Sequence, residues 1–251
     1  MKIFIPKEDS NELRTAISPE VVKKLSGSGH EIFIETNAGS GSNFDDEILI
    51  EAGAKIYNDN NQLKTADFIF RVNAPSENEI AIYKEDSILI ASLNPYNNIE
   101  IIKKLEAQKT ISFAMELMPR ITRAQSMDVL SSQSNLAGYQ AVIEASNIFN
   151  KAMPMMMTAA GTIAPAKVMV FGAGVAGLQA IATAKRLGAI VSATDVRMAA
   201  KEQVESLGGK FVMVEMEEDE DSETSGGYAK EMSKEFKLKQ AELISKTISS
   251  Q

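Results

Sequence analysis

The most constraining feature of the sequence is a glycine-rich turn, Gly172-Ala173-Gly174-Val175-Ala176-Gly177. It directly follows the apolar run 168–171 and opens a segment, 175–187, whose composition favours a helix. A buried strand, a tight glycine turn and a helix in this order are the start of a βαβ unit that binds dinucleotides. Glycine turns are common, so the flanking strand and helix are what make this motif informative.

Each glycine of the turn has its own physical task. Gly172 permits the tight turn, Gly174 lets the backbone approach a pyrophosphate, and Gly177 allows the helix to pack closely on the strand. The N-terminus of the following helix offers N–H groups and the positive end of its dipole to the phosphates. We therefore expect a dinucleotide to bind here, through Gly172, Gly174 and Gly177.

The residues that follow the next strand bear on which dinucleotide binds. The predicted strand 189–194 ends at Asp195, at the spacing of about 20 residues where an acid accepts the ribose hydroxyls. A carboxylate there repels a 2′-phosphate and so favours NAD over NADP. Arg197 lies two residues later and weakens this argument, because a guanidinium could contact an adenosine phosphate.

The first part of the chain alternates short apolar strands with helices. Strands are predicted at 3–5, 32–34, 55–57, 68–70, 88–90 and 110–114, with helices opening at Ser18-Pro19, spanning about 45–52, and passing through Leu105. This alternation favours an open, mostly parallel sheet. We interpret residues 1–126 as a Rossmann-like (flavodoxin-like) domain of the α/β class.

A long helix and a second α/β domain are predicted to follow. Residues 127–152 carry apolar residues at roughly helical spacing and contain no proline, which predicts a helix linking the two domains. An irregular, methionine-rich connection, 153–161, precedes the glycine turn. Further predicted elements are a helix over 199–207, a strand over 211–214 and a final helix over about 228–246. Residues 153–251 would then form a second Rossmann domain with a mostly parallel sheet.

Composition excludes several kinds of chemistry. The chain has one histidine, His30, and no cysteine, so it lacks the residues for thiol catalysis and for a histidine-rich metal site. We expect His30 to be structural and any activity to belong to a bound cofactor. The net charge of −8 argues against nucleic-acid binding. No signal peptide or long apolar span is evident, which favours a cytoplasmic protein.

A second polar group lies just before the long helix, in the segment from Arg120 to Asp128. Gln125 could bond an amide, and Arg120 could be held by Asp128 while it faces a phosphate or carboxamide. The spacing alone fits equally a helix start with a surface ion pair. Both interpretations stay open on these residues.

Several motifs together resemble the NAD(H)-binding subunits of proton-translocating NAD(P) transhydrogenases, which share a superfamily with alanine dehydrogenases. The resemblance runs from Met1 almost to the last residue and is carried by the segments 115–120, 123–128, 131–139, 154–161, 171–188, 201–211 and 226–232. Alanine dehydrogenases share the pattern Pro6-Lys7-Glu8, but they lack the segment 120–128 as it stands here.

The resemblance implies roles for individual residues. Arg120, Gln125 and Asp128 would position the nicotinamide, with Ser131 on its carboxamide side. The pyrophosphate would be held by Gly172, Gly174, Val175 and Gly177, the adenosine ribose by Asp195 and Arg197, and Gly227 and Tyr228 would belong to a loop that closes over NAD(H). No general acid or base is needed for a direct hydride transfer.

The resemblance also implies partners: a membrane subunit that conducts protons, an NADP(H)-binding domain, and a second copy in a homodimer. The chain would thus be attached peripherally to the inner membrane. Family members continue past the position of Ile248, so the second domain is expected to be truncated at its C-terminus. An inactive remnant that at most binds nucleotide or a partner is the main alternative. Alanine dehydrogenase is a second one, for which Arg14 and Arg71 could supply positive charge.

Overall fold

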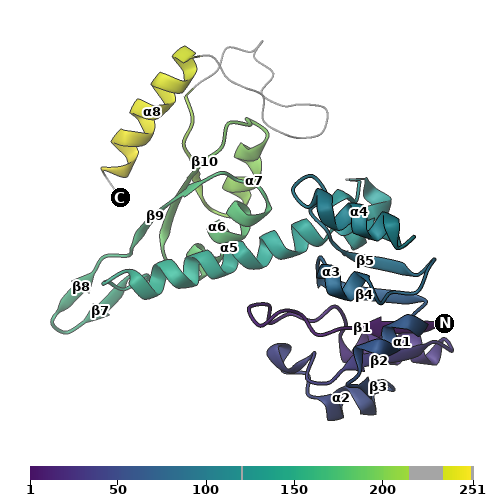
Figure 1. Ribbon diagram of the computed structural model, residues 1–251. Helices are drawn as coiled ribbons and strands as arrows, with labels where there is room; N and C mark the ends of the chain where they lie inside the picture. Colours follow the sequence, from purple (N-terminus) through teal and green to yellow (C-terminus); the bar gives the residue numbers. More distant parts are fainter. Residues whose placement is uncertain (120, 215–233, 250–251) are drawn as a thin grey trace. The chain divides into compact units, whose positions relative to one another are not determined.

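A computed structural model describes residues 1–119, 121–214 and 234–249. The chain forms two compact units, Met1–Asp128 and Val129–Gln251, shown in Figure 1. Each unit is built around its own parallel sheet. No helix in the described ranges is long and apolar enough to span a membrane.

The first unit contains a six-stranded sheet in the order β3-β2-β1-β4-β5-β6, and all neighbouring strands are parallel. The strands are β1 Lys2–Ile5, β2 Glu31–Glu35, β3 Lys55–Tyr57, β4 Phe68–Asn73, β5 Ile88–Ser92 and β6 Ile111–Ala114. Each predicted strand of this unit is confirmed. The order is that of the Rossmann fold, so the flavodoxin-like expectation is corrected: a flavodoxin sheet has the order 2-1-3-4-5.

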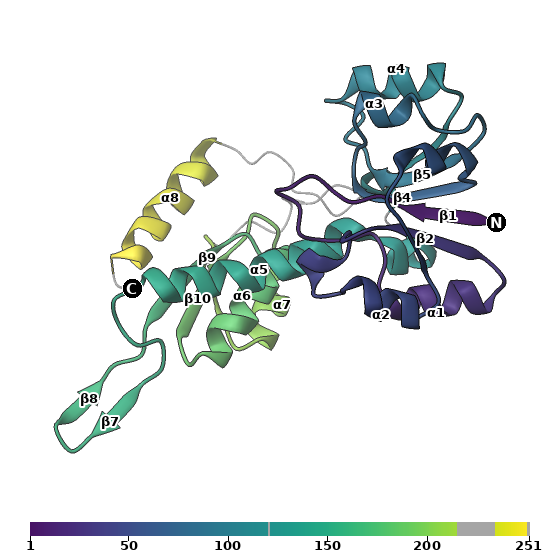
Figure 2. The ribbon, with the colours of Figure 1, turned by 60° about the horizontal axis from the view of Figure 1, so that its bottom comes forward.

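Helices cover both faces of this sheet. Figure 2 shows α1 (Pro19–Gly27) and α2 (Asp46–Glu51) on one side, and α3 (Glu77–Ile80) and α4 (Ile99–Ala107) on the other. The Ser18 hydroxyl accepts a hydrogen bond from the Val21 N–H, and Pro19 begins α1, which confirms the predicted helix start. The four-residue α3 was not predicted, because it is too short to show helical periodicity.

The alternation of side chains along β1 divides the core into two layers. Ile3 and Ile5 pack into the cluster beneath α1 and α2, while Phe4 points into the cluster on the other face. Phe4 stacks on Phe33 with ring centroids 4.6 Å apart. The same strand therefore joins both halves of the core.

A buried ion network lies where the strand order reverses, between the ends of β1 and β4. The Arg71 guanidinium donates to Glu79 and, over 3.1 Å, to Glu8, and the Arg71 and Glu8 side chains are 4% and 3% exposed. Glu8 also accepts the Val72 N–H at 2.7 Å, and the Tyr83 hydroxyl donates to Glu79 at 2.5 Å. These contacts give both carboxylates hydrogen-bond donors, so the protein's own charged groups occupy the position where the strand order of the first sheet reverses.

Replacement of Arg71 by Met should destabilise the first unit by about 3–5 kcal/mol, because Glu8 and Glu79 would remain buried without their cation. Urea unfolding followed by far-ultraviolet circular dichroism measures this. Lys104→Met is the control: Lys104 makes an exposed ion pair with Glu77, and its loss should cost about 0.5 kcal/mol or less. An equal loss of stability in the two variants would contradict the stabilising role of Arg71 in the buried network.

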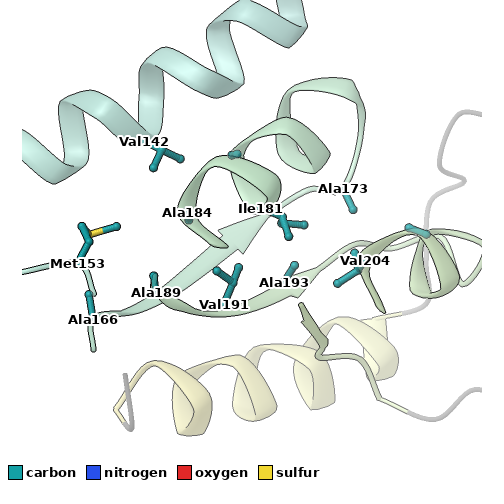
Figure 3. Close-up of a cluster of buried hydrophobic side chains, with 12 residues drawn as sticks. Val142, Met153, Ala166, Ala173, Ile181, Ala184, Ala189, Val191, Ala193 and Val204 are labelled. Atoms are coloured by element: carbon teal, nitrogen blue, oxygen red, sulfur yellow. The ribbon is translucent and has the colours of Figure 1, made fainter. Parts of the chain in front are cut away.

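The second unit holds a three-stranded parallel sheet in the order β11-β10-β9. Its elements are β9 Lys167–Phe171, α6 Val175–Arg186, β10 Ile190–Thr194, α7 Ala200–Ser206, β11 Lys210–Phe211 and α8 Lys234–Ile248. Figure 3 shows Ile181, Val191, Ala193 and Val204 in the core between these helices and strands. This order is half of a doubly wound sheet.

One predicted strand in this unit is shorter than expected. The apolar run 211–214 predicted a strand, but β11 ends at Phe211. Val212 still donates to the Ala193 carbonyl, whereas the Val214 N–H donates to the side chain of Gln240 at 2.8 Å. A side chain from α8 therefore replaces the neighbouring strand as hydrogen-bond partner. The predicted start of the final helix, at about Tyr228, lies outside the described residues.

The predicted long helix is α5, Val129–Ile148, and it packs along α6 within the second unit. Gly138 lies at their closest approach. A Cβ atom on Gly138 would lie 2.0 Å from the Ala176 carbonyl oxygen, in the first turn of α6. Gly138 is thus required for close packing of the two helices.

The methionine-rich connection is a β-hairpin, not the irregular segment that was predicted. β7 (Met156–Thr158) and β8 (Gly161–Ile163) pair antiparallel, and Figures 1 and 2 show them extending away from the sheet of their unit. The strands are only three residues long and show no alternation of polar and apolar residues, so no sequence pattern marked them. Met155, Met156 and Met157 are exposed, while Met153 is buried.

Replacement of Gly138 by Ala should push α5 away from α6 and destabilise the second unit by about 1–3 kcal/mol. Gly27→Ala is the matched control, since a Cβ on Gly27 meets no atom within 4 Å; it should change stability by about 0.5 kcal/mol or less. Thermal unfolding of both variants gives the comparison. A Gly138→Ala protein as stable as the control would contradict the close contact.

Candidate functional site

The glycine turn connects β9 to α6 at the end of the second sheet. Gly172 has φ +89°, in the left-handed region that favours glycine. A Cβ on Gly177 would lie 1.8 Å from the Gly172 carbonyl oxygen, so the turn and the helix approach more closely than any side chain permits. Gly172 thus permits the tight turn, and Gly177 permits the close packing of the helix, as the sequence predicted.

Gly174 faces open space, as Gly172 does, but unlike Gly172 it has an ordinary negative φ. A Cβ there would meet no heavy atom within 4 Å, and its φ of −75° is accessible to any residue. It is the N-cap of the 12-residue helix α6, whose first turn begins at Val175 and contains no acidic residue. A phosphate can therefore approach the backbone here and receive N–H donors from the helix N-terminus.

Asp195 lies directly after β10 and beside the glycine turn. Its carboxylate accepts the Ala173 N–H at 2.7 Å, which fixes the acid to the loop. Arg197 forms a two-point ion pair with the same carboxylate, at 2.9 Å through Nε and 3.0 Å through Nη2. The Asp195 side chain is 7% exposed. Burial acts to raise the pKa of this carboxyl, but the hydrogen bonds from Arg197 and Ala173 outweigh it and hold the pKa below its usual value.

A pocket of about 370 Å³ opens between the ends of β9 and β10 and the helix α8. Gly172, Asp195 and Arg197 line it from the strand side, and Gln240 and Ile244 line it from α8. The glycine turn and Asp195, the acid predicted to bind ribose, therefore line the same pocket. Its size and mixed lining suit one half of a dinucleotide.

Gln240 is a site residue that the sequence analysis missed. It is 9% exposed and donates to the Thr194 hydroxyl at 2.8 Å and to the Val212 carbonyl at 3.2 Å. These bonds fasten α8 to the end of β10, immediately before Asp195. The only available signal was the helical spacing of Gln240 and Ile244, which places both on one face of α8.

The predicted nicotinamide loop lies in other elements. Gln125 is exposed within the 3₁₀ helix Thr122–Met127, and Asp128 follows it and is half-buried. Both belong to the first unit, while Ser131 lies in the first turn of α5 in the second. Arg120, Gly227 and Tyr228 lie outside the described residues. The roles of all six remain predictions.

Arg14 and Arg71, the two arginines that could supply positive charge in an alanine dehydrogenase, are both paired with carboxylates. Arg71 is buried against Glu8 and Glu79, as described above. Arg14 donates to Glu12 at 2.8 Å through Nε and 2.6 Å through Nη2. The hydrogen bonds from Arg14 lower the pKa of Glu12 to about 2, so this pair stays ionised at neutral pH.

Comparison with known proteins assigns each of the two units to a protein family. Residues 4–137 match the family described as alanine dehydrogenase/PNT, N-terminal domain, and residues 141–250 match the corresponding C-terminal domain. The chain is 56% identical over 255 aligned residues to the first polypeptide of the NAD(P) transhydrogenase alpha subunit of Rhodospirillum rubrum, covering 99% of this chain and 66% of that protein. The same polypeptide of Rickettsia prowazekii is 50% identical, with the same coverage of 99% and 66%.

A solved structure gives the same result. The transhydrogenase of Sinorhizobium meliloti superposes with a TM-score of 0.82 at 57% identity, over 84% of this chain and 64% of that one. The chain thus spans slightly less than two thirds of the length of these relatives.

The glycine turn allows binding to be separated from folding. Gly174→Ala should leave stability unchanged, because the methyl group has room, yet lower affinity for NADH by about tenfold or more by filling the space a phosphate needs. Gly177→Ala should instead destabilise the second unit by about 1–3 kcal/mol through its overlap with Gly172. Nicotinamide fluorescence and thermal unfolding measure the two effects. Unchanged NADH affinity in a folded Gly174→Ala protein would rule out this loop as the phosphate site.

Proposed function

Since the chain belongs to the alanine dehydrogenase/PNT family, we propose that it is the NAD(H)-binding subunit of a proton-translocating NAD(P) transhydrogenase. In this role it presents the nicotinamide of NAD(H) for direct hydride transfer to or from NADP(H), which a partner domain binds. The observation that carries the proposal is the placement of Asp195 beside the glycine turn, with its carboxylate fixed to the Ala173 N–H. This arrangement suits the ribose and pyrophosphate of one dinucleotide.

The residues of the second unit would hold the cofactor by its adenosine half. Gly172, Gly174, Val175 and Gly177 would bind the pyrophosphate through backbone N–H groups and the α6 dipole. Asp195 would accept the ribose hydroxyls, with Arg197 beside it. The pocket formed with Gln240 and Ile244 would receive the adenosine.

The nicotinamide half would be positioned by Arg120, Gln125, Asp128 and Ser131, and the loop with Gly227 and Tyr228 would close over it. When bound, NAD(H) supplies the hydride chemistry. The protein orients the ring and excludes water, and it needs no acid, base or nucleophile for this. Such a task agrees with a chain that has a single histidine and no cysteine.

The proposal includes partners that this chain does not contain. A membrane subunit would conduct protons, a further domain would bind NADP(H), and two copies of the chain would form a homodimer. The chain would then work in the cytoplasm, at the inner membrane. The name of the relatives, a subunit alpha, supports a multi-subunit complex.

Two alternative functions differ in what they require. An inactive remnant would bind nucleotide or a partner without supporting hydride transfer, so an activity assay separates it from the enzyme. Alanine dehydrogenase activity needs a free cationic group for a carboxylate substrate, and the pairing of Arg14 with Glu12 and of Arg71 with Glu8 and Glu79 disfavours it.

The first experiment is a titration of the chain with NADH and, separately, NADPH, followed by nicotinamide fluorescence. Wild type should bind NADH more tightly than NADPH, and Asp195→Ala should lose about tenfold or more in NADH affinity because the ribose loses its acceptor. Asp67→Ala is the control, since that half-buried carboxylate binds Lys84 and the Lys2 N–H in the first unit and not in the second.

Reconstitution separates the transhydrogenase from the remnant. The chain is mixed with the two proposed partners, a proton-conducting membrane subunit and an NADP(H)-binding domain of a transhydrogenase, and hydride transfer from NADH to NADP⁺ is measured. Transfer above that of the partners alone supports the enzyme. NADH binding without transfer would favour the remnant, and a folded chain that binds no NADH would overturn the proposal.

A further inference from the structure

The Asp195 carboxylate is fully engaged by groups of the protein itself. Its Oδ1 atom accepts the Arg197 backbone N–H and Nε, both at 2.9 Å. Its Oδ2 atom accepts the Ala173 N–H at 2.7 Å and Arg197 Nη2 at 3.0 Å. Since a carboxylate offers about four lone-pair positions, these contacts use its capacity. A ribose diol can bond to it only if one of these donors leaves.

The four donors differ in how easily they can leave. The Ala173 N–H is fixed by the glycine turn, and the Arg197 N–H is fixed by the backbone after β10. The Arg197 side chain is 22% exposed and is the group that can rotate away. Its Nη2 also donates to the Ala173 carbonyl at 3.3 Å, so the guanidinium lies across the start of the glycine turn.

From this geometry we propose that Arg197 competes with the ribose diol for the Asp195 carboxylate, and that this ion pair determines the specificity of the adenosine subsite. The guanidinium occupies the acceptor positions on the Asp195 carboxylate that a ribose diol would use. When NAD(H) binds, the diol replaces the guanidinium at these positions. This inference rests on the proposed binding of NAD(H) and adds the means of discrimination against NADP(H).

Discrimination between NAD(H) and NADP(H) follows from the ion pair between Asp195 and Arg197. An arginine near the ribose is the usual partner of a 2′-phosphate, so its presence alone would favour NADP(H). Here the carboxylate holds the guanidinium by a two-point ion pair, and the same carboxylate repels the phosphate that would have to displace it. A diol exchanges with the guanidinium without charge repulsion. Asp195 thus acts twice, as acceptor for the diol and as the group that withholds Arg197 from a 2′-phosphate.

Four proteins test the exchange: wild type, Arg197→Ala, Asp195→Ala and the double variant. Each is titrated with NADH and NADPH by nicotinamide fluorescence, with thermal unfolding as the measure of folding. Arg197→Ala should bind NADH about threefold or more tightly than wild type, because the diol no longer competes with the guanidinium. Asp195→Ala should bind NADPH about tenfold or more tightly than wild type, through the released arginine. The double variant should lose that gain.

The outcomes distinguish this inference from the proposed function. If wild type binds no NADH, the proposed function fails. If wild type binds NADH but Arg197→Ala binds it more weakly, Arg197 contacts the bound cofactor rather than competing with it, and the exchange is overturned. A gain in NADPH affinity that survives in the double variant would show that Arg197 is not the phosphate partner. Should Asp195→Ala fold poorly, Asp195→Asn serves in its place, because its amide oxygen can still accept the Arg197 N–H.

Discussion

The candidate site depends on contacts between backbones that only glycine permits. Gly177 lies against the Gly172 carbonyl, and Gly138 of α5 lies against the Ala176 carbonyl in the same turn of α6. Together these contacts fix the start of α6 from both sides, and the direction of its first N–H groups follows from that placement. Because the contacts involve carbonyl oxygens and not flexible side chains, no rearrangement of rotamers can absorb a larger residue. The positions of the N–H groups that would bind a phosphate therefore depend on the packing of α5 against α6 as well as on the glycine turn.

The three strands of the second sheet, β11-β10-β9, repeat the order of β3-β2-β1 in the first, but the carboxyl ends of these strands differ between the two units. In the first, Arg71, Glu8 and Glu79 form a buried ion network at the position between β1 and β4, in which Arg71 Nε has no hydrogen-bond partner. In the second, the end of β9 carries a turn of small residues, and Gly174 faces open space. A parallel sheet of this order offers a ligand position at its carboxyl edge, but side chains decide whether that position stays open. The position at the carboxyl edge of the sheet is therefore occupied by protein groups in the first unit, and in the second unit it is the proposed site for the pyrophosphate and adenosine of NAD(H).

The sequence predicted most of this fold because short apolar strands and capped helices are local signals. All six strands of the first sheet, the start of α1 at Ser18 and the helices α5 and α6 were predicted from such patterns. The features that were missed depend on contacts distant in the chain. The strand β11 ends at Phe211, and the Val214 N–H beyond it bonds to Gln240 of α8. The role of Gly138 likewise arises from its contact with α6. For the site, spacing predicted that Asp195 would follow the glycine turn, but only the structure shows that Arg197 already occupies its carboxylate.

Binding of NAD(H) at the glycine turn of the second unit can be measured by amide hydrogen exchange with and without saturating NADH. We predict slower exchange in residues 172–178 and 195–197, where phosphates and ribose would contact the backbone, and little change along β4 and the loop after β1. Protection centred on the first unit, or no protection at 172–178 while NADH is bound, would contradict binding at this turn.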